Sequence, residues 1–362
     1  MGLGKELGRL THDRLDRRTG LPRTLDDLTA HIVGELLGRP VRRVERLAET
    51  AGTTARARLG VEGDGTPPSV FVKLAPRPAA VRLFVGLARL GQTEVSFYER
   101  LAPALPIAAP RAHAARYDGR TGRFALVLED LGARGCQFAD VRGAPSPAEA
   151  EAVVRALATL HGTYAAPTGS GALSWVVTNA ADPAAPLTAR LLRLVVGRLR
   201  RTDPALLPPD SALLIESQRQ FEARLPRDGF TLLHGDPHFG NVYFDGDVPG
   251  FVDWQVLRRG LGLRDLAYFL TLSLPTERRR AEERHLLDLY LDVLPRHGGP
   301  VLDRAESWRR YRLLVAYPFV AAAFTRAAGG LQAEEIAGSG LQRAGAAMDD
   351  LDTMDEVRQL LR

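Results

Sequence analysis

Two short stretches hold the residues whose types and spacing could do chemistry. HGDPHFGN, residues 234–241, carries Asp236 and Asn241 five positions apart, on a segment whose proline and two glycines forbid a regular helix. Asp253 follows at the end of a later apolar run, GFVD. A carboxylate can position and deprotonate an attacking hydroxyl, while an amide oxygen and a second carboxylate are hard donors that suit Mg²⁺. Three such groups on neighbouring loops are what phosphoryl transfer requires.

The use of lysine is a second chemical signal. The 48 basic residues include only two lysines, Lys5 and Lys73. Lys73 lies in VFVKL, whose alternating pattern predicts a strand, whereas Lys5 lies in a flexible-looking N-terminus. A compact ammonium can bridge phosphate oxygens as a point charge, whereas the larger, planar guanidinium of arginine demands a different geometry. Lys73 is therefore a candidate phosphate ligand, and a strand lysine that points to solvent is the alternative.

Length and charge narrow the class of protein. A chain of 362 residues with 45% hydrophobic residues can bury a sizeable core, and its length favours two domains or lobes. The net charge of +5 could indicate nucleic-acid binding, but the arginines are mixed with nearly as many carboxylates, as in TERRRAEERH. We interpret these segments as solvated helix faces and expect no nucleic-acid partner. A cleft that attracts nucleotide phosphates would use the same positive surplus.

The sequence favours neither a membrane span nor a disulfide. The longest uncharged apolar run, 313–324, contains Pro318 and is well short of the roughly 20 residues that a span needs. The N-terminal segment carries charges at short intervals and has no apolar signal core. Because Cys136 is the single cysteine, no intramolecular disulfide can form, which fits a reducing compartment. We expect a cytoplasmic protein without a membrane partner.

The elements that must position these residues fall into two groups. The first group, up to about residue 130, combines helical patterns with short alternating runs that predict strands. The helical patterns lie at 24–38 and 79–101, and the strand patterns at 55–61, 69–74, 111–117 and 123–129. A small sheet flanked by helices is the expected result.

After LEDLGARG the pattern changes to long helices rich in Ala, Leu and Arg. These lie at 146–164, 186–201, 209–224, 277–295 and 303–328. The exception is 230–255, where turn residues are dense between short apolar runs. Such a segment predicts hairpins and functional loops, and it contains the chemical motif.

The central motif carries a clear family resemblance. His-x-Asp-x-x-x-x-Asn, followed by an aspartate and preceded by a strand lysine, resembles the protein-kinase-like fold. HGDPHFGN with FVDWQ resembles the aminoglycoside phosphotransferase and choline kinase-like family, closest to its ecdysteroid kinase-like (CHK kinase-like) group of small-molecule kinases. The resemblance covers about residues 40–350. It implies ATP- and Mg²⁺-dependent transfer of the γ-phosphate to a hydroxyl of a small molecule.

The same resemblance implies an α+β, bilobal, protein-kinase-like fold. Residues 1–131 would form a small N-terminal lobe with an antiparallel sheet that binds the nucleotide. Residues 132–362 would form a larger, mainly helical C-terminal lobe with the catalytic and acceptor-binding residues.

Roles are implied residue by residue at matching positions. Asp236 matches the catalytic base, and His234 is expected to orient its loop by hydrogen bonding. Asn241 and Asp253 match the ligands of Mg²⁺. Lys73 matches the lysine that contacts the α- and β-phosphates of ATP.

A helix glutamate should pair with that lysine. GQTEVSFYERLAP offers Glu94 and, as a competitor, Glu99. Glu94 is favoured because it precedes Phe97 and Tyr98 as the corresponding glutamate does in the related kinases.

Two further segments are implied to meet the nucleotide. Gly52, Thr53 and Thr54 fall where the turn that covers the phosphates should be, although no G-x-G-x-x-G occurs there. Glu129 and Leu131 lie in LEDL, which matches the hinge whose backbone would meet the adenine.

Departures from the protein-kinase pattern bear on regulation and substrate. HGD replaces HRD, DWQ replaces DFG, and no APE follows. The arginine that can pair with a phosphorylated activation segment is therefore missing, so we expect a small-molecule acceptor rather than a protein. A P-loop kinase is disfavoured because no G-x-x-x-x-G-K-[ST] occurs.

Three other positions have simpler interpretations. Pro237 separates His234 from His238 and breaks the helix that would place both on one face, which disfavours a zinc pair. His161 is interpreted as a structural histidine at a helix end. Asp265 is interpreted as a residue that caps the following helix or ties it to the catalytic loop.

Two alternatives to a kinase stay open at this point. One is a nucleotide-binding pseudokinase or interaction module without phosphoryl transfer, and the other is an enzyme that transfers AMP to a protein. Competent residues at all the key positions favour the kinase. The identity of the acceptor, the choice between ATP and GTP, the role of His238 and the oligomeric state are left undecided by the sequence.

Overall fold

The protein is described by a computed structural model that covers most of the chain. The residues described are 2–15, 20–50, 54–139, 143–165, 171–182, 185–204, 207–208, 210–328 and 334–362. Two compact units are present. The first unit comprises Met1–Gln137 with Val252–Val256, and the second comprises Phe138–Phe251 with Leu257–Arg362.

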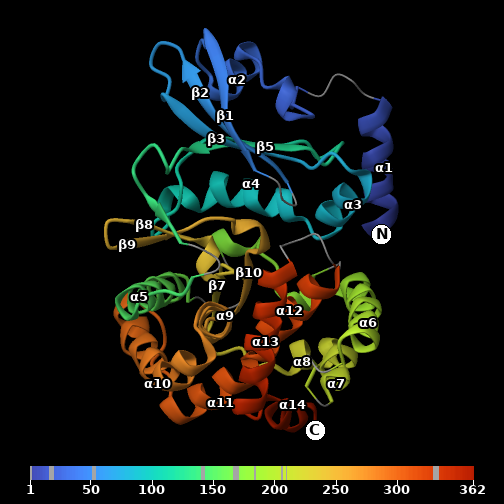
Figure 1. Ribbon diagram of the computed structural model, residues 1–362, viewed down its shortest axis with the longest axis vertical. Helices are drawn as coiled ribbons and strands as arrows, with labels where there is room; N and C mark the ends of the chain where they lie inside the picture. Colours follow the sequence, from blue (N-terminus) through green and yellow to red (C-terminus); the bar gives the residue numbers. More distant parts are fainter. Residues whose placement is uncertain are drawn as a thin grey trace. The chain divides into compact units, whose positions relative to one another are not determined.

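The first unit is a five-stranded antiparallel sheet with helices on both faces (Figure 1). Its strands, in spatial order β1-β2-β3-β5-β4, are β1 (Arg43–Thr50), β2 (Ala55–Glu62), β3 (Ser69–Leu74), β5 (Phe124–Glu129) and β4 (Ala112–Tyr117). Its helices are α1 (Gly2–Leu15), α2 (Ala30–Leu37), α3 (Ala79–Leu87) and α4 (Leu90–Arg100). The predicted small antiparallel-sheet lobe is confirmed.

Alternation along the strands gives the sheet two different faces. Val70 and Val72 on β3 point to one face and pack with Val33 of α2 in a hydrophobic core. Lys73, between Val72 and Leu74, points to the opposite face, which α4 covers in part. The period of two in VFVKL therefore decides which side of the sheet carries the lysine.

The predicted helix 79–101 is two helices, α3 and α4. Arg89 between them has a left-handed backbone, with φ of 57°, which ends the first helix and redirects the chain. On α4, a Cβ at Gly91 would lie 2.2 Å from the ring of Phe124 on β5. The glycine therefore lets α4 approach the sheet closely enough for its side chains to reach Lys73.

The N-terminus, which we expected to be flexible, forms helix α1 with an inverted pattern of burial. Its buried side chains are the charged Glu6, Arg9 and Asp13. Asp13 forms ion pairs with Arg82 of α3 and Arg123 near β5. A hydrophobic periodicity cannot reveal a helix that docks through charges, which explains the wrong prediction.

We expect Asp13→Asn to destabilise the protein by about 3 kcal/mol at neutral pH, because two buried arginines lose their partner. Burial alone would raise the pKa of Asp13, but hydrogen bonds from Arg123 and Arg82 outweigh it and lower the pKa below 3.8. The stabilisation is therefore complete above pH 3.8 and is lost as the pH falls through the lowered pKa.

Thermal unfolding of the wild type and Asp13→Asn between pH 7 and 3 measures this effect, and the two curves should converge at the acid end. Asp64→Asn is the matched control, since Asp64 pairs with Arg42 at the surface, where solvent screens the pair, and its loss should change the stability little. An Asp13→Asn curve parallel to that of the wild type would contradict the assignment.

The second unit is mainly helical (Figure 1). Its helices are α5 (Pro147–Thr163), α6 (Ala185–Thr202), α7 (Ser211–Glu216), α8 (Gln218–Arg224), α9 (Leu263–Ser273), α10 (Thr276–Val293), α11 (Arg304–Leu314), α12 (Ala316–Ala328), α13 (Glu334–Asp350) and α14 (Thr353–Leu361). Its small sheets contain β6 (Gln137–Phe138), β7 (Phe230–Leu233), β8 (Val242–Asp245), β9 (Val248–Phe251) and β10 (Arg258–Leu261). Together the two units confirm the predicted α+β class.

Short strands and one buried helix position the chemical motif. All four residues of β7 are buried, and β7 pairs antiparallel with β10. The segment 234–241 leaves β7 and enters the β8–β9 hairpin, which turns at Gly246 with φ of 60°. Helix α9 packs against α10, α11, α12 and α13, so it is held from several sides.

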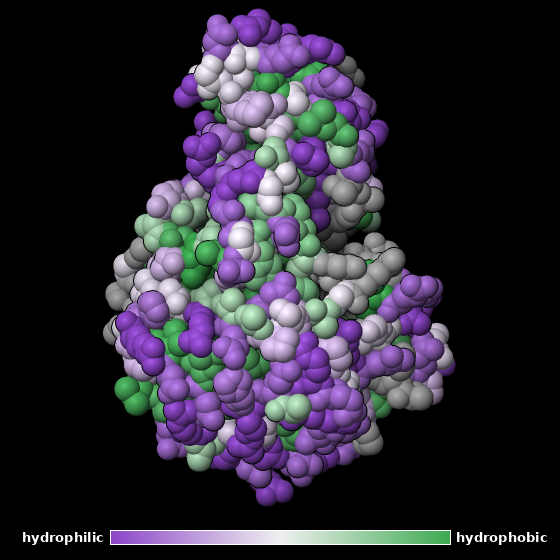
Figure 2. All heavy atoms as spheres, turned by 60° about the vertical axis from the view of Figure 1, so that its left-hand side comes forward, coloured by the Kyte–Doolittle hydropathy of each residue, from purple (hydrophilic) through white to green (hydrophobic). Residues whose placement is uncertain are grey.

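The surface view agrees with the mixed charge pattern of the sequence. Hydrophilic residues cover most of the face shown in Figure 2, and the hydrophobic areas between them are smaller. Surface arginines find carboxylates nearby, as Arg304 does with Asp288 and Asp292. Among the helices described, none is long and apolar enough to cross a bilayer.

Candidate active site

The first unit brings Lys73, Glu94 and Asp253 together. The Nζ atom of Lys73 lies 2.6 Å from Oε2 of Glu94 and 2.8 Å from Oδ1 of Asp253. Glu94 and Lys73 are almost fully buried, and Asp253 is largely buried. Of the two candidate glutamates, Glu94 is the one that contacts the lysine, and Glu99 is exposed.

Aromatic packing holds Asp253 in place. Its neighbour Trp254 is fully buried and stacks on Phe97 of α4, with ring centroids 4.2 Å apart and planes 9° from parallel. Asp253 itself has a φ of 66°, in the left-handed region that few residues other than glycine adopt. Such strain persists only where the surroundings enforce it, which makes Asp253 a functional candidate.

The electrostatics of this cluster balance two cations against two carboxylates. Burial raises the pKa of Glu94, Lys73 opposes that rise, and Asp253 adds to it. Arg56 of β2 lies directly opposite Lys73 and places Nη2 3.4 Å from Oδ2 of Asp253. Its Nε donates to the hydroxyl of the buried Thr54. Arg56 was not predicted from the sequence. It alternates with buried apolar residues on β2, and this pattern could have indicated that it lies on the opposite face of the sheet from the core.

The predicted nucleotide turn and hinge are described in part. Gly52 and Thr53 lie outside the described residues. Glu129 ends β5, and its carboxylate accepts the backbone N–H of Arg111 at 2.8 Å. Leu131 is buried, and its carbonyl accepts a hydrogen bond from the N–H of Cys136 in the following turn.

Asp130, between those two hinge residues, was not singled out from the sequence. It accepts three hydrogen bonds of 2.8–3.1 Å from the guanidinium of Arg58, and two more from the N–H groups of Gly132 and Ala133. Burial alone would raise the pKa of Asp130, but the bonds from Arg58 and Ser69 outweigh it and hold the pKa below its usual value. The hinge is therefore tied to β2 by an ionised carboxylate.

The second unit brings Asp236 and Asn241 together on one loop. The Nδ2 group of Asn241 donates to the Asp236 carbonyl at 2.9 Å and to the Asp236 carboxylate at 3.2 Å. The N–H of Asp236 in turn donates to Nδ1 of the buried His234 at 3.2 Å. His238 places Nε2 3.8 Å from the same carboxylate. These contacts hold Asp236 while a quarter of its side chain stays exposed, as a base that meets a substrate requires.

A buried network supports this loop from behind. Asp265 on α9 accepts the N–H of His234 at 2.7 Å and that of Gly235 at 3.1 Å. Its carboxylate also lies 3.3 Å from Nε2 of His161, whose Nδ1 is 3.0 Å from the hydroxyl of Tyr290. Asp265 thus ties α9 to the loop, and His161 is a buried link between α5 and α10.

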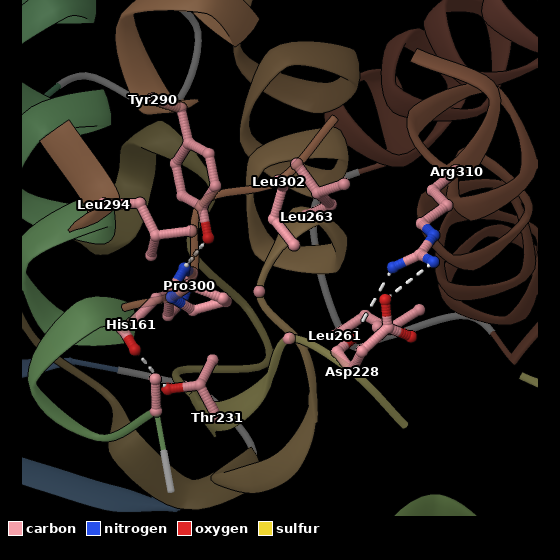
Figure 3. A pocket seen from close by; sticks show the side chains of 13 residues that line it. His161, Asp228, Thr231, Leu261, Leu263, Tyr290, Leu294, Pro300, Leu302 and Arg310 are labelled. Atoms are coloured by element: carbon pink, nitrogen blue, oxygen red, sulfur yellow. Dashed lines mark hydrogen bonds and ion pairs between the residues drawn. The ribbon is translucent and has the colours of Figure 1, made fainter. Parts of the chain in front are cut away.

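Figure 3 shows how this network borders a small pocket of the second unit. The hydroxyl of Tyr290 points at the ring of His161, and the hydroxyl of Thr231 on β7 donates to the carbonyl of His161 at 2.7 Å. At the other end of the same pocket, Arg310 pairs with Asp228. The polar side chains named here find partners inside the protein.

We expect Asp265→Asn to cost about 3 kcal/mol of stability and most of the activity, because an amide cannot accept from two backbone N–H groups and His161 together. Urea unfolding and turnover of the same preparation measure both effects. Asp288→Asn serves as control, since Asp288 is exposed. Wild-type unfolding of Asp265→Asn would show that the network is dispensable.

Tyr268 is a second residue that the sequence did not reveal. Its buried phenol lies close enough to Asp236 for the charge of that carboxylate to act on it. Burial, followed by the charge of Asp236, raises the pKa of Tyr268 well above 10, so the phenol stays protonated. In the sequence, Tyr268 lies among apolar residues, one helical turn after Arg264 on α9. A tyrosine in such a pattern is interpreted as part of the hydrophobic core.

The donor set fits a hard cation better than zinc. Both hydrogen-bonding contacts of the Asn241 amide nitrogen go to Asp236, which leaves Oδ1 as its acceptor for a ligand. An amide oxygen is a hard donor of the kind that Mg²⁺ prefers. Among the described residues, no group of three or more His, Cys, Asp or Glu side chains could hold a metal ion.

The comparisons with known proteins agree on one family of folds. The family model described as "Phosphotransferase enzyme family" matches residues 57–314. A search of curated proteins found no match.

Solved structures with the same fold are similar over most of this chain. A choline/ethanolamine kinase family protein from Mesorhizobium loti has a TM-score of 0.50 and 14% identity, covering 88% of this chain and 92% of its own. A choline kinase from Streptococcus pneumoniae has a TM-score of 0.51 and 14% identity, covering 89% and 98%. An amicoumacin kinase in complex with AMP-PNP, Ca²⁺ and "Ami" has a TM-score of 0.51 and 13% identity, covering 85% of this chain and 88% of its own. At these identities the similarity establishes the fold.

Proposed function

Because the chain belongs to the phosphotransferase enzyme family, we propose that it transfers the γ-phosphate of ATP to a hydroxyl group of a small molecule. The observation that carries this proposal is the loop on which the amide of Asn241 holds the Asp236 carboxylate while a quarter of that side chain stays exposed. The closer resemblance to the ecdysteroid kinase-like group stays a prediction, because none of the comparisons tests it.

Each residue of the two clusters has a defined task in this reaction. Asp236 positions the acceptor hydroxyl and takes its proton, while His234 keeps the loop in shape. Lys73, oriented by Glu94, binds phosphate oxygens.

The metal proposed here is Mg²⁺, held by Asn241 and Asp253. When bound, it neutralises the charge that develops on the transferred phosphate. A solved structure of the same fold was obtained with AMP-PNP and Ca²⁺, which supports a nucleotide and a divalent cation. Lys73 binds the Asp253 carboxylate, so the carboxylate proposed for the metal lies next to the cation proposed for the phosphates.

A thermal-shift titration of the full chain tests the nucleotide proposal. ATP with Mg²⁺ at about 100 times the dissociation constant should stabilise the fold by roughly 2.7 kcal/mol and raise the midpoint by a few degrees. ATP without Mg²⁺ should shift the midpoint less. An unchanged midpoint at saturating nucleotide would favour an interaction module that binds no nucleotide.

An acceptor screen then tests the chemistry. The enzyme is incubated with ATP, Mg²⁺ and a panel of metabolite alcohols, and the products are identified by mass spectrometry. A product heavier by one phosphate supports the kinase, whereas an adenylate on protein would indicate AMP transfer. Nucleotide binding without any product across the panel would indicate a pseudokinase.

A further inference from the structure

The face of the sheet that carries Lys73 also carries two arginines. Arg56 pairs across the ladder with Lys73, and Arg58 pairs with Phe71. Directly opposed residues of antiparallel strands point to the same face, as do residues two apart on one strand. All four side chains, together with Leu128 of β5 opposite Phe71, therefore share one face. None of the roles proposed above uses Arg58.

The two arginines differ in their surroundings. Arg56 lies in the ion cluster, with its guanidinium near Asp253 and Thr54. Arg58 reaches the hinge, where three hydrogen bonds of 2.8–3.1 Å fix its guanidinium on the carboxylate of Asp130. The carboxylate is 3% exposed and the side chain of Arg58 is 43% exposed. A planar cation is thus held rigidly while part of it faces outward.

The hinge backbone is shaped around this guanidinium. A Cβ at Gly132 would lie 3.3 Å from Oδ1 of Asp130 and 3.6 Å from Cζ of Arg58. The backbone of the hinge therefore lies against the Arg58–Asp130 pair. Polar backbone groups next to a flat, partly exposed cation form a surface suited to a flat heterocycle that also carries hydrogen-bonding edges.

The direction in which a nucleotide would extend along this face of the sheet follows from which end of the face other elements of the first unit cover. At the Glu94 end of this face, α4 closes over the sheet, and Gly91 contacts Phe124. At the other end, Phe71 is half-buried and the side chain of Arg58 is 43% exposed. Arg56 and Arg58 are two residues apart on β2, which separates their Cα atoms by about 6.7 Å. A ribose can span the distance between a base that lies on Arg58 and phosphates that lie at Arg56.

We infer that Arg58, locked by Asp130, is the residue on which the nucleobase stacks, and that Arg56 is a second phosphate-binding cation beside Lys73. The inference rests on the proposed function, since it assigns binding roles within the same nucleotide site. No G-x-G-x-x-G precedes β2, so side-chain cations take a larger share of phosphate binding than a glycine-rich backbone would leave them. Stacking on a guanidinium favours any purine, so Arg58 contributes to affinity without distinguishing adenine from guanine.

The experiment separates the two halves of the nucleotide. Dissociation constants of ATP, adenosine and inorganic tripolyphosphate are measured by calorimetry with Mg²⁺ for the wild type, Arg58→Ala and Arg56→Ala. We expect Arg58→Ala to weaken adenosine and ATP by about tenfold and to leave tripolyphosphate within threefold of the wild type. Arg56→Ala should weaken tripolyphosphate and ATP and leave adenosine unchanged.

Two further variants separate stacking from charge and from folding. Arg58→Lys keeps the charge without the plane, so it should bind adenosine as weakly as Arg58→Ala does. Asp130→Asn should weaken adenosine less, because it loosens the platform without removing it. Arg43→Ala is the matched control, an exposed arginine on β1 of the same sheet. Melting curves of each variant report whether it is folded.

The possible outcomes decide between the inference and the function on which it rests. Wild-type affinity of Arg58→Ala for adenosine, or equal losses of both half-ligands in both arginine variants, would overturn the inference and leave the kinase proposal standing. A wild type that binds none of the three ligands would overturn both. A selective loss of adenosine affinity in Arg58→Ala, together with a selective loss of tripolyphosphate affinity in Arg56→Ala, supports the assignment.

Discussion

Replacing Asp236 by alanine is expected to lower phosphoryl transfer by about 100- to 10,000-fold, the range typical of a lost general base. The change removes the carboxylate that accepts a hydrogen bond from the amide of Asn241. Affinity for MgATP should stay within a few-fold of the wild type, because the carboxylate acts on the acceptor hydroxyl and not on the nucleotide. Turnover and nucleotide dissociation constants, measured on one preparation, test both parts.

The control for this variant is Asp247→Ala, which removes an exposed carboxylate from the β8–β9 turn of the same unit. Its turnover should match that of the wild type. Full turnover of Asp236→Ala would refute the role of Asp236 as base. A parallel loss of nucleotide affinity would mean that the substitution had disturbed the fold of the loop.

Replacing Asp253 by alanine is expected to remove most of the Mg²⁺ dependence of ATP binding. The loss of one charge-assisted metal contact corresponds to roughly a 10- to 100-fold weaker affinity for MgATP. Without Mg²⁺ the substitution should not weaken the binding of ATP. Asp253 binds the Nζ of Lys73 at 2.8 Å, so its removal frees the ammonium for phosphate oxygens. ATP affinity in a chelator should therefore be unchanged or higher.

Binding of ATP to the wild type and to Asp253→Ala is measured in Mg²⁺ and in a chelator. Asp64→Ala, which removes an exposed carboxylate from the same unit, controls for the change in net charge. If Mg²⁺ strengthens ATP binding equally in Asp253→Ala and the wild type, Asp253 is not a metal ligand. Glu94 remains as a partner of Lys73 in the variant, so the first unit should stay folded.

Elements with a strong local period were predicted close to their observed bounds. The strands at 55–61, 69–74 and 123–129 agree with β2, β3 and β5 to within one residue at each end. The helix expected at 146–164 is α5, which begins after the capping serine Ser146. In these segments, alternation and capping are properties of adjacent residues, so they can be read without the fold.

Breaks and charged interfaces were missed for a common reason. The run 303–328 is divided into α11 and α12, just as 79–101 is divided into α3 and α4. β1 was not predicted, because the apolar residues of its sequence, RVERLAET, lie among charged ones. α1 was missed because its buried face is ionic. In each case tertiary contacts, and not local hydrophobicity, stabilise the observed conformation.

The sequence by itself determined the chemistry available to this protein. Residue types and spacing in HGDPHFGN, together with one strand lysine in a chain built on arginine, were enough to predict phosphoryl transfer. The stiffness of a Pro- and Gly-containing loop and the period of a strand are local properties, which is why they could be read directly.

Only the tertiary structure decided which side chains act together. It selected Glu94 over Glu99 and placed Asp253, 180 residues from Lys73, in contact with that lysine. It also brought Asp265 into contact with the backbone of His234, at the start of the segment 234–241. Such partners are separated by intervals that no helix or strand period encodes. Their pairing depends on how strands and helices pack, because charged and polar groups that packing buries must find partners wherever the chain returns.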